Sequence, residues 1–132
     1  MTPEQKQKKI LVVDDDNDIL DIMREALTFE GYEVNSLEKT DNIFPEIIQY
    51  QPDIVILDYL LTGVNGGELC HQIKINRHTT NIPVILMSAH PRVLQSLGDY
   101  GCDLFIPKPF DLANLLSSIQ KLISTSPVQN NE

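Results

Sequence analysis

The sequence lacks long hydrophobic runs, has few cysteines and is poor in basic residues. Its apolar runs are only a few residues long, whereas a membrane-spanning helix needs about 20. The opening residues, MTPEQKQKK, lack the apolar segment of a secretory signal peptide, so we expect a cytoplasmic protein. Cys70 and Cys102 match neither a metal-binding spacing nor a dense disulfide framework, and we expect two reduced thiols packed as small hydrophobic groups.

Positive charge is scarce. The chain has 10 Lys and Arg against 19 Asp and Glu, a net charge of −9 at pH 7 and a pI of about 4.6. Surfaces that bind nucleic acid are usually basic, so direct contact with nucleic acid is not expected. One basic cluster, Lys6, Lys8 and Lys9, is interpreted as a solvated part of the N-terminal leader. The negative charge instead suits a protein that binds metal cations or a basic partner surface.

Short apolar runs alternate with amphipathic segments along the 132 residues. The runs at residues 10–14, 53–58, 83–88 and 103–108 predict strands, and residues 32–36 predict a weaker one. The first three are almost continuously apolar, which is typical of strands covered on both faces in a parallel sheet. Helical spacing of apolar residues predicts helices over residues 18–30, 66–76 and 111–124, and less clearly over 91–100.

A further helix is predicted to start near Asp41 or Asn42, either of which can cap it, and to end before Pro52. Five strand–helix alternations indicate an α/β fold: a doubly wound, five-stranded parallel sheet with helices on both faces, as in flavodoxin-like domains. We therefore expect a polar leader at residues 1–8, one domain at 9–124 and a disordered tail at 125–132.

Polar side chains end four of the predicted strands. The first strand ends in Asp14, Asp15 and Asp16, and later strands end in Asp58, Ser88 and Lys108. Each has an ordinary explanation alone, such as a turn residue or, for Asp16 or Asn17, a helix cap. Ligands of open parallel sheets bind where the carboxyl ends of the strands meet, so together these residues predict a functional site.

This combination of side chains suits phosphoryl chemistry. Clustered carboxylates are the ligands of a hard cation such as Mg²⁺, which would offset the repulsion between adjacent aspartates. A lysine and a hydroxyl could bind phosphoryl oxygens, and the central Asp58 could act as a nucleophile that forms an acyl phosphate. No histidine or cysteine has a comparable position.

The motifs LVVDDDNDI, PDIVILDYLLTGVNGGEL, PVILMSAH and GCDLFIPKPF resemble, in order and spacing, those of the receiver domain of two-component response regulators. The resemblance covers about residues 8–123. It implies that Asp58 accepts a phosphoryl group from a phosphohistidine of a sensor histidine kinase or histidine phosphotransfer protein, with Mg²⁺ as cofactor. It further implies these roles: Asp15 as direct metal ligand, Asp14 as its acidic neighbour acting through water, the Leu60 carbonyl as third protein ligand, Ser88 and Lys108 as phosphoryl-binding groups, and Phe105 as switch aromatic.

The chain departs from the family pattern at several positions. Leu61-Thr62 replaces the usual Met/Leu-Pro pair, and Phe105 lacks the hydroxyl of the usual tyrosine, so a switch there would work by packing alone. Leu60 and His90 would flank the phosphoryl group and are predicted to slow water attack on it. For His90, we favour a solvent-facing position over one that overhangs the phosphoryl group.

Other functions remain open at this point. A degenerate receiver could act only as an interaction module, and an Asp-nucleophile phosphatase would share Asp58 but usually has a second Asp where this chain has Leu60. A flavodoxin-like cofactor protein would need a phosphate-binding loop rich in Ser, Thr and Gly after the first strand. The leading hypothesis is a phosphoacceptor domain and not an enzyme, present as a monomer or phosphorylation-dependent dimer, that acts on a downstream protein and contacts no membrane.

Overall fold

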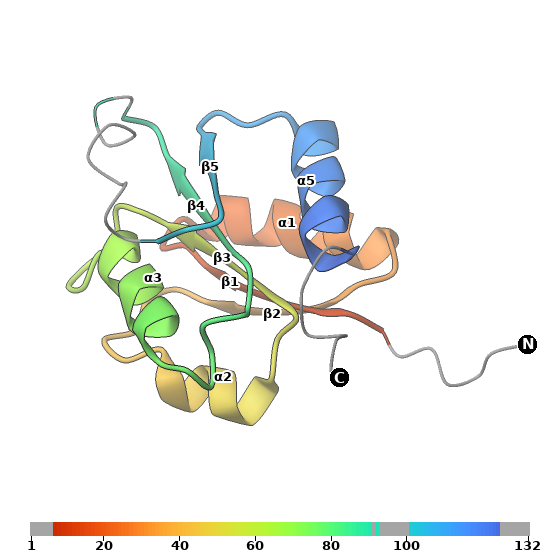
Figure 1. Cartoon of the computed structure of the whole chain (residues 1–132). Coiled ribbons are helices and arrows are strands. Elements are labelled where there is room, and N and C mark those ends of the chain that lie inside the picture. Colours follow the sequence, from red (N-terminus) through yellow and green to blue (C-terminus); the bar gives the residue numbers. More distant parts are fainter. Residues whose placement is uncertain (1–6, 91, 93–100, 125–132) are drawn as a thin grey trace, which may run out of the picture.

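The computed structural model describes residues 7–90, 92 and 101–124, and it forms a five-stranded parallel sheet with helices on both faces (Figure 1). The strand order is β2-β1-β3-β4-β5. The elements are β1 (Lys9–Val13), α1 (Asn17–Phe29), β2 (Glu33–Leu37), α2 (Phe44–Tyr50), β3 (Ile54–Asp58), α3 (Gly66–Ile75), β4 (Val84–Ser88), β5 (Leu104–Pro107) and α5 (Leu112–Ser124). The predicted doubly wound α/β fold is confirmed. The helix predicted at 91–100, most of the leader and the tail at 125–132 lie outside the described residues.

Burial explains which strands are central. Every residue of β3 and β4 is buried, as are the last four of β1, and these three strands lie side by side in the middle of the sheet. The edge strands β2 and β5 are only partly buried. The parallel register places Asp58 of β3 opposite Met87 of β4, and Val13 of β1 opposite Leu57 of β3. The carboxyl ends of β1, β3 and β4 therefore lie next to one another on the same side of the sheet.

The sheet separates two hydrophobic cores. Successive side chains of a strand point to opposite faces, so Ile10 and Val12 pack under α1 and α5 while Leu11 and Val13 pack under α2 and α3. Each fully buried aliphatic side chain of this kind stabilises the fold by roughly 1.5–3 kcal/mol relative to exposure. These two cores hold the strand ends in fixed positions.

The ends of α1 match the sequence expectation. Asp16 caps the helix: its Oδ1 accepts hydrogen bonds from the backbone N–H of Asp18 at 2.9 Å and of Ile19 at 3.4 Å. Gly31 follows the helix with a φ of +98°, a conformation that glycine adopts without steric cost. The cap holds the start of α1 directly after Asp14 and Asp15, the two aspartates that follow β1.

The predicted cap of α2 is wrong. The helix begins at Phe44 with Ile43 at the capping position, and no side chain caps it. Asn42 Oδ1 instead accepts a hydrogen bond from the Phe44 N–H at 3.1 Å, in the turn that leads into the helix. Ile43 is fully buried, so packing of this side chain decides where the helix starts. Pro45 lies in the first turn, where its missing N–H costs nothing.

Two expectations from composition can be compared with the structure. Cys70 and Cys102 form no disulfide, as predicted, and Cys70 is buried while Cys102 is half-buried. Among the residues described, no helix combines the length and apolar character needed to cross a bilayer.

Candidate functional site

Three carboxylates meet at the carboxyl ends of β1 and β3. Asp14, Asp15 and Asp58 each place one oxygen within 4.8 Å of the others. Asp14 is fully buried and the Asp58 side chain is 8% exposed, whereas Asp15 lies at the surface. The structure thus brings together three of the predicted metal-binding residues.

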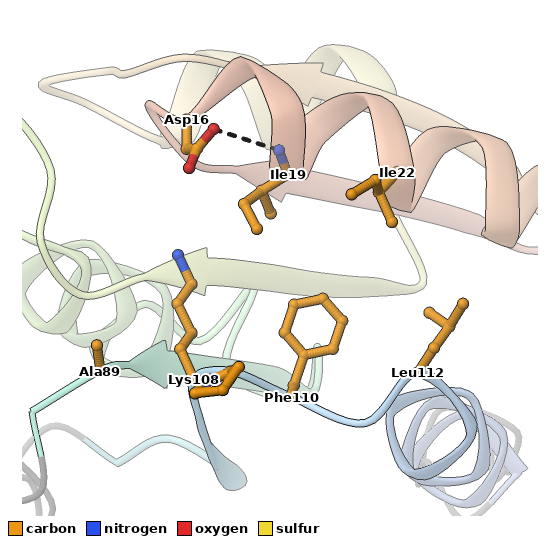
Figure 2. Close-up of a pocket in the computed structure, with 8 residues that line it drawn as sticks. Asp16, Ile19, Ile22, Ala89, Lys108, Phe110 and Leu112 are labelled. Atoms are coloured by element: carbon orange, nitrogen blue, oxygen red, sulfur yellow. Dashed lines mark hydrogen bonds between the residues drawn. The ribbon is translucent and has the colours of Figure 1, made fainter.

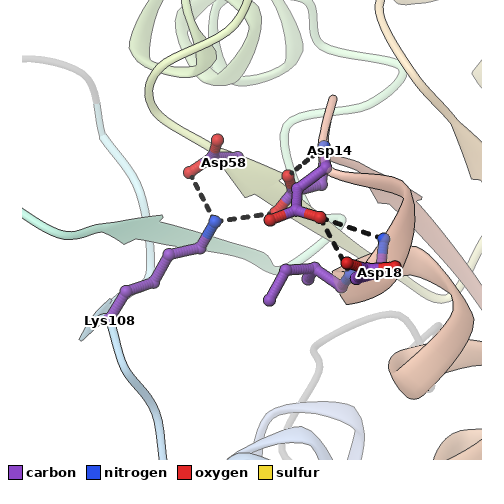
Figure 3. A network of polar contacts seen from close by, with 6 residues as sticks. Asp14, Asp18, Asp58 and Lys108 are labelled. Carbon is purple, nitrogen blue, oxygen red and sulfur yellow. Dashed lines mark hydrogen bonds and ion pairs between the residues drawn. The ribbon is translucent and has the colours of Figure 1, made fainter.

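Lys108 links the two buried carboxylates (Figure 3). Its Nζ lies 2.9 Å from Asp14 Oδ2 and 3.2 Å from Asp58 Oδ1. The lysine follows β5, and its backbone N–H donates a hydrogen bond of 2.8 Å to the carbonyl oxygen of Ser88. Residues that end β3 and β4 and residues that directly follow β1 and β5 therefore form one site.

The backbone fixes Asp14 in this position. Its Oδ1 accepts a hydrogen bond from the Asp16 N–H at 2.9 Å, while its own N–H donates to the Leu37 carbonyl at 3.1 Å. One carboxylate oxygen thus faces the start of α1 and the other faces Lys108. This arrangement limits rotation of the Asp14 side chain.

Burial leaves an electrostatic imbalance at Asp58. Loss of solvent raises the pKa of Asp58, the negative charge of Asp14 raises it further, and Lys108 only partly counteracts both, giving a pKa of about 6. Burial also lowers the pKa of Lys108, but hydrogen bonds and negative charge from Asp14 and Asp58 outweigh this and raise it overall. The single ammonium of Lys108 does not neutralise three carboxylates. The site therefore keeps a net negative charge that a bound cation would offset. Oxygen ligands of this type fit Mg²⁺.

Ser88 lies at the end of β4, next to β3, and is 2% exposed. Its Oγ accepts a hydrogen bond from the His90 N–H at 3.0 Å. The His90 residue is exposed, in agreement with the favoured solvent-facing interpretation. Ser88 is therefore bonded through its hydroxyl to the segment after β4 and through its carbonyl to Lys108.

Two further residues were predicted to take part in the site, Leu60 and Phe105. The Leu60 residue, two positions after Asp58, is 52% exposed. Phe105 on β5 is partly buried and packs against the core on the α2 and α3 side. The predicted metal-ligand role of the Leu60 carbonyl and the switch role of Phe105 stay predictions.

Gly66 is a structurally important residue that the sequence analysis did not identify as such. A Cβ at this position would lie 2.1 Å from the carbonyl oxygen of Asp58, which is far inside contact distance. The Gly66 N–H also donates a 2.9 Å hydrogen bond to the Tyr59 carbonyl, and Asn65 and Glu68 form a capping box around the start of α3. The signal in the sequence is a glycine directly after a helix-capping residue, eight positions after Asp58.

A largely apolar groove opens beside Lys108 (Figure 2). Figure 2 shows Ile19 and Ile22 of α1 on one side, facing Lys108, Phe110 and Leu112 on the other. Its volume is about 420 Å³, and its lining residues are Asp16, Ile19, Ile22, Ala89, Lys108, Pro109, Phe110 and Leu112. We call it the proximal groove, because Lys108 belongs both to it and to the carboxylate site.

The sequence profile of the response regulator receiver domain matches residues 10–120. The chain belongs to this family. The phosphate regulon transcriptional regulatory protein PhoB of Pseudomonas aeruginosa is 33% identical over 119 residues, covering 88% of this chain and 52% of PhoB. The response regulator MprA of Mycobacterium sp. (strain KMS) is also 33% identical, over 122 residues. This receiver domain spans about half the length of these curated relatives.

Solved structures agree with this assignment. The response regulator TrrA of Thermotoga maritima, crystallised with Mg²⁺ and BeF, has a TM-score of 0.79 and 29% identity, covering 88% of this chain and 99% of that one. A CheY-like receiver domain from Methanospirillum hungatei has a TM-score of 0.83 and 27% identity, covering 95% and 100%. The family resemblance inferred from the motifs is confirmed, and the roles of the individual site residues stay predictions.

Proposed function

We propose that this receiver domain is a phosphorylation-dependent switch in which Asp58 accepts a phosphoryl group from a phosphohistidine. The observation that carries the proposal is the placement of Asp58, a nearly buried carboxylate within ion-pairing distance of Lys108 and next to Asp14 and Asp15. This is one nucleophile surrounded by groups able to bind a cation and phosphoryl oxygens.

The proposed reaction is a substitution at phosphorus. An Asp58 carboxylate oxygen attacks the phosphorus of the donor, so an O–P bond forms and the N–P bond to the donor imidazole breaks. The leaving nitrogen keeps the electron pair and takes a proton. Lys108 then changes from bridging Asp14 and Asp58 to pairing with a phosphoryl oxygen, and the Ser88 hydroxyl donates a hydrogen bond to another.

Mg²⁺ would be held by the Asp14, Asp15 and Asp58 carboxylates together with the Leu60 carbonyl, and when bound it supplies positive charge that offsets the crowded oxygens. The three carboxylates lie close enough to share one ion, and the raised pKa of Asp58 reflects negative charge that a cation would offset. The residues present therefore fit the metal. TrrA, a related response regulator, was crystallised with Mg²⁺ and BeF.

The proposed partners follow from this chemistry. The donor is a sensor histidine kinase or histidine phosphotransfer protein, and the output passes to a downstream protein that distinguishes the two charge states of the site. The added phosphoryl group brings about −1.5 to −2 charges. Absence of direct nucleic-acid contact stays a prediction, because relatives such as PhoB are transcriptional regulatory proteins of which this chain spans about half. The cytoplasmic location and the classification as a phosphoacceptor and not an enzyme are also predictions.

Phosphoryl uptake can be measured by intact-mass spectrometry with acetyl phosphate as donor. We expect a mass gain of one phosphoryl group that requires Mg²⁺, disappears with EDTA and is absent in Asp58→Asn. Asp16→Asn is the matched control, because Asp16 caps α1 and is not one of the three clustered carboxylates. An Asp58→Asn protein that gains the same mass would contradict the proposal. A wild-type protein that binds Mg²⁺ without any gain would favour the degenerate interaction module.

A further inference from the structure

A second cavity lies where the segment after α1 meets α5. Its volume is about 380 Å³, and it is lined by Glu30, Tyr32, Ala113, Leu116, Ser117 and Gln120. We call it the Glu30 pocket. It shares no residue with the proximal groove or with the carboxylate site. Small-molecule sites in proteins usually occupy about 300–1,000 Å³, so the Glu30 pocket is large enough for a small ligand.

The polar groups of this pocket are not used by the protein itself. They are the carboxylate of Glu30, the hydroxyls of Tyr32 and Ser117 and the amide of Gln120. None of these four side chains forms a hydrogen bond or an ion pair with another described residue. The Tyr32 ring and Leu116 pack against the hydrophobic core and supply an apolar wall. The pocket therefore offers a ligand both hydrogen-bonding groups and apolar surface.

The charge of the pocket favours a cation. Glu30 is the only charged residue among those that line it. Glu30 is also the C-cap of α1, and the carboxyl end of a helix carries partial negative charge. No basic residue occupies the last turn of α1 to offset this charge. Burial and the Glu30 charge raise the pKa of the Tyr32 hydroxyl, so this group stays neutral and adds no positive charge.

We propose that the Glu30 pocket binds a small aliphatic diamine or polyamine. One ammonium group pairs with the Glu30 carboxylate beside the Tyr32 ring, and the methylene stem contacts Leu116. An ammonium group donates hydrogen bonds and accepts none, so the oxygens of Ser117 and Gln120 are suitable acceptors for it. A hard metal cation such as Mg²⁺ requires several oxygen ligands and gains nothing from the apolar wall. The binding does not depend on phosphoryl transfer to Asp58.

Titration of the isotope-labelled protein with diaminobutane, followed by NMR at constant ionic strength, tests this inference. We expect the amide resonances of Glu30, Tyr32, Ser117 and Gln120 to shift with a Kd on the order of a few millimolar. Butanediol keeps the stem without the charge and methylammonium keeps a charge without the stem, so each should bind about fivefold more weakly or less well still. Absence of these shifts with diaminobutane, or equal binding of either control compound, would overturn the proposal.

Variants separate the pocket from the overall negative charge of the protein. We expect Glu30→Gln to weaken diaminobutane binding about three- to fivefold, whereas Glu38→Gln removes the same charge from an exposed residue after β2 and should bind like the wild type. Ala113→Lys places an ammonium group of the protein in the pocket and should weaken binding about tenfold or more.

Asn114→Lys is the matched control for Ala113→Lys. It adds the same charge at the next residue of α5, which is exposed and does not line the pocket, so it should bind like the wild type. Equal weakening in Glu30→Gln and Glu38→Gln, or in the two lysine variants, would show attraction by net charge alone and would overturn the assignment of the pocket.

Discussion

At the scale of single residues, the site combines groups that oppose one another. Asp14 and Asp58 are buried with like charge, and Lys108 stands within 2.9 Å of one and 3.2 Å of the other. The pKa of Asp58 nevertheless stays raised, because burial and Asp14 outweigh the lysine. The metal-free site is therefore held in an unfavourable charge state by the packing of the strands that carry it.

Replacing Asp58 should stabilise the metal-free protein in a pH-dependent way. The pKa of Asp58 is about 6 in the folded protein against an ordinary value of 3.8, so the folded state favours the protonated carboxyl. The contribution of this group to stability is present below about pH 4 and is lost as the pH rises through 6. At pH 7.5 we expect Asp58→Asn to raise the free energy of unfolding by about 1–3 kcal/mol, with no gain near pH 4. Urea unfolding in EDTA at the two pH values measures this, and a gain that is equal at both would contradict it.

Leu60 and His90 should control the lifetime of the acyl phosphate. The Leu60 residue is 52% exposed after Asp58, and the exposed His90 follows Ser88 by two residues. Side chains at these positions can obstruct water on its path to the phosphorus. We expect Leu60→Asn and His90→Ala each to speed dephosphorylation about two- to fivefold, equivalent to roughly 0.5–1 kcal/mol in the barrier. The decay of the phosphorylated mass over time measures the rate, and unchanged rates in both variants would disprove this role.

At the scale of elements, the start of α3 sets the position of the Asp58 backbone. The helix begins against the end of β3, where Gly66 lies so close to the Asp58 carbonyl that a side chain cannot fit. The capping box of Asn65 and Glu68 fixes the first turn of the helix. The nucleophile is therefore positioned both by its own strand and by the helix that follows.

Gly66→Ala should damage both stability and the site. Its Cβ would press on backbone atoms that cannot rotate away, so we expect a loss of about 2–3 kcal/mol and slower phosphoryl uptake. Gly31→Ala is the control: it has a positive φ of +98° but no heavy atom within 4 Å of the added Cβ. The control should lose about 1–2 kcal/mol and keep its uptake rate. Equal uptake in the two variants, measured by intact mass, would contradict the positioning role of Gly66.

The strands and most helices were predictable because their patterns are local. Continuous apolar runs indicated β1, β3 and β4, and helical spacing indicated α1, α3 and α5. The start of α2 was not predictable, since it depends on burial of Ile43 against residues distant in sequence. The close approach of Gly66 to Asp58 was hidden for the same reason, because it is a contact between a helix and a strand. The residues that end the predicted strands indicated which side chains meet in the site. The hydrogen bond from the His90 N–H to the Ser88 hydroxyl could not be predicted in this way.

At the scale of the whole molecule, the sheet separates the protein into two layers that share one edge. The layer with α1 and α5 carries the proximal groove, while the layer with α2 and α3 packs around Phe105 and Leu57. Asp58 is the last residue of β3 and pairs with Lys108, which directly follows β5, so both lie at the carboxyl ends of the strands. Phosphorylation of Asp58 would therefore change the charge next to both layers, the one with α1 and α5 and the one with α2 and α3.

Mg²⁺ should stabilise the whole fold through the three carboxylates. A ligand that binds only the folded state adds about 2.7 kcal/mol at a free concentration 100 times its Kd. We expect the Tm of the wild type to rise with Mg²⁺, and this rise to be much smaller in Asp15→Asn, because Asp15 belongs to the cluster. Asp16→Asn keeps the cap of α1 and should keep the full rise. A rise of equal size in Asp15→Asn and the wild type, measured by thermal unfolding, would place the metal elsewhere.

The position of the phosphoryl group is the most direct test of the central claim. Borohydride reduces an aspartyl phosphate to homoserine, so peptide mapping after phosphorylation with acetyl phosphate and reduction identifies the modified residue. We predict homoserine at position 58 in samples with Mg²⁺ and none in samples with EDTA. Homoserine at position 14 or 15, or no homoserine in a protein that gained phosphoryl mass, would contradict Asp58 as the phosphoacceptor.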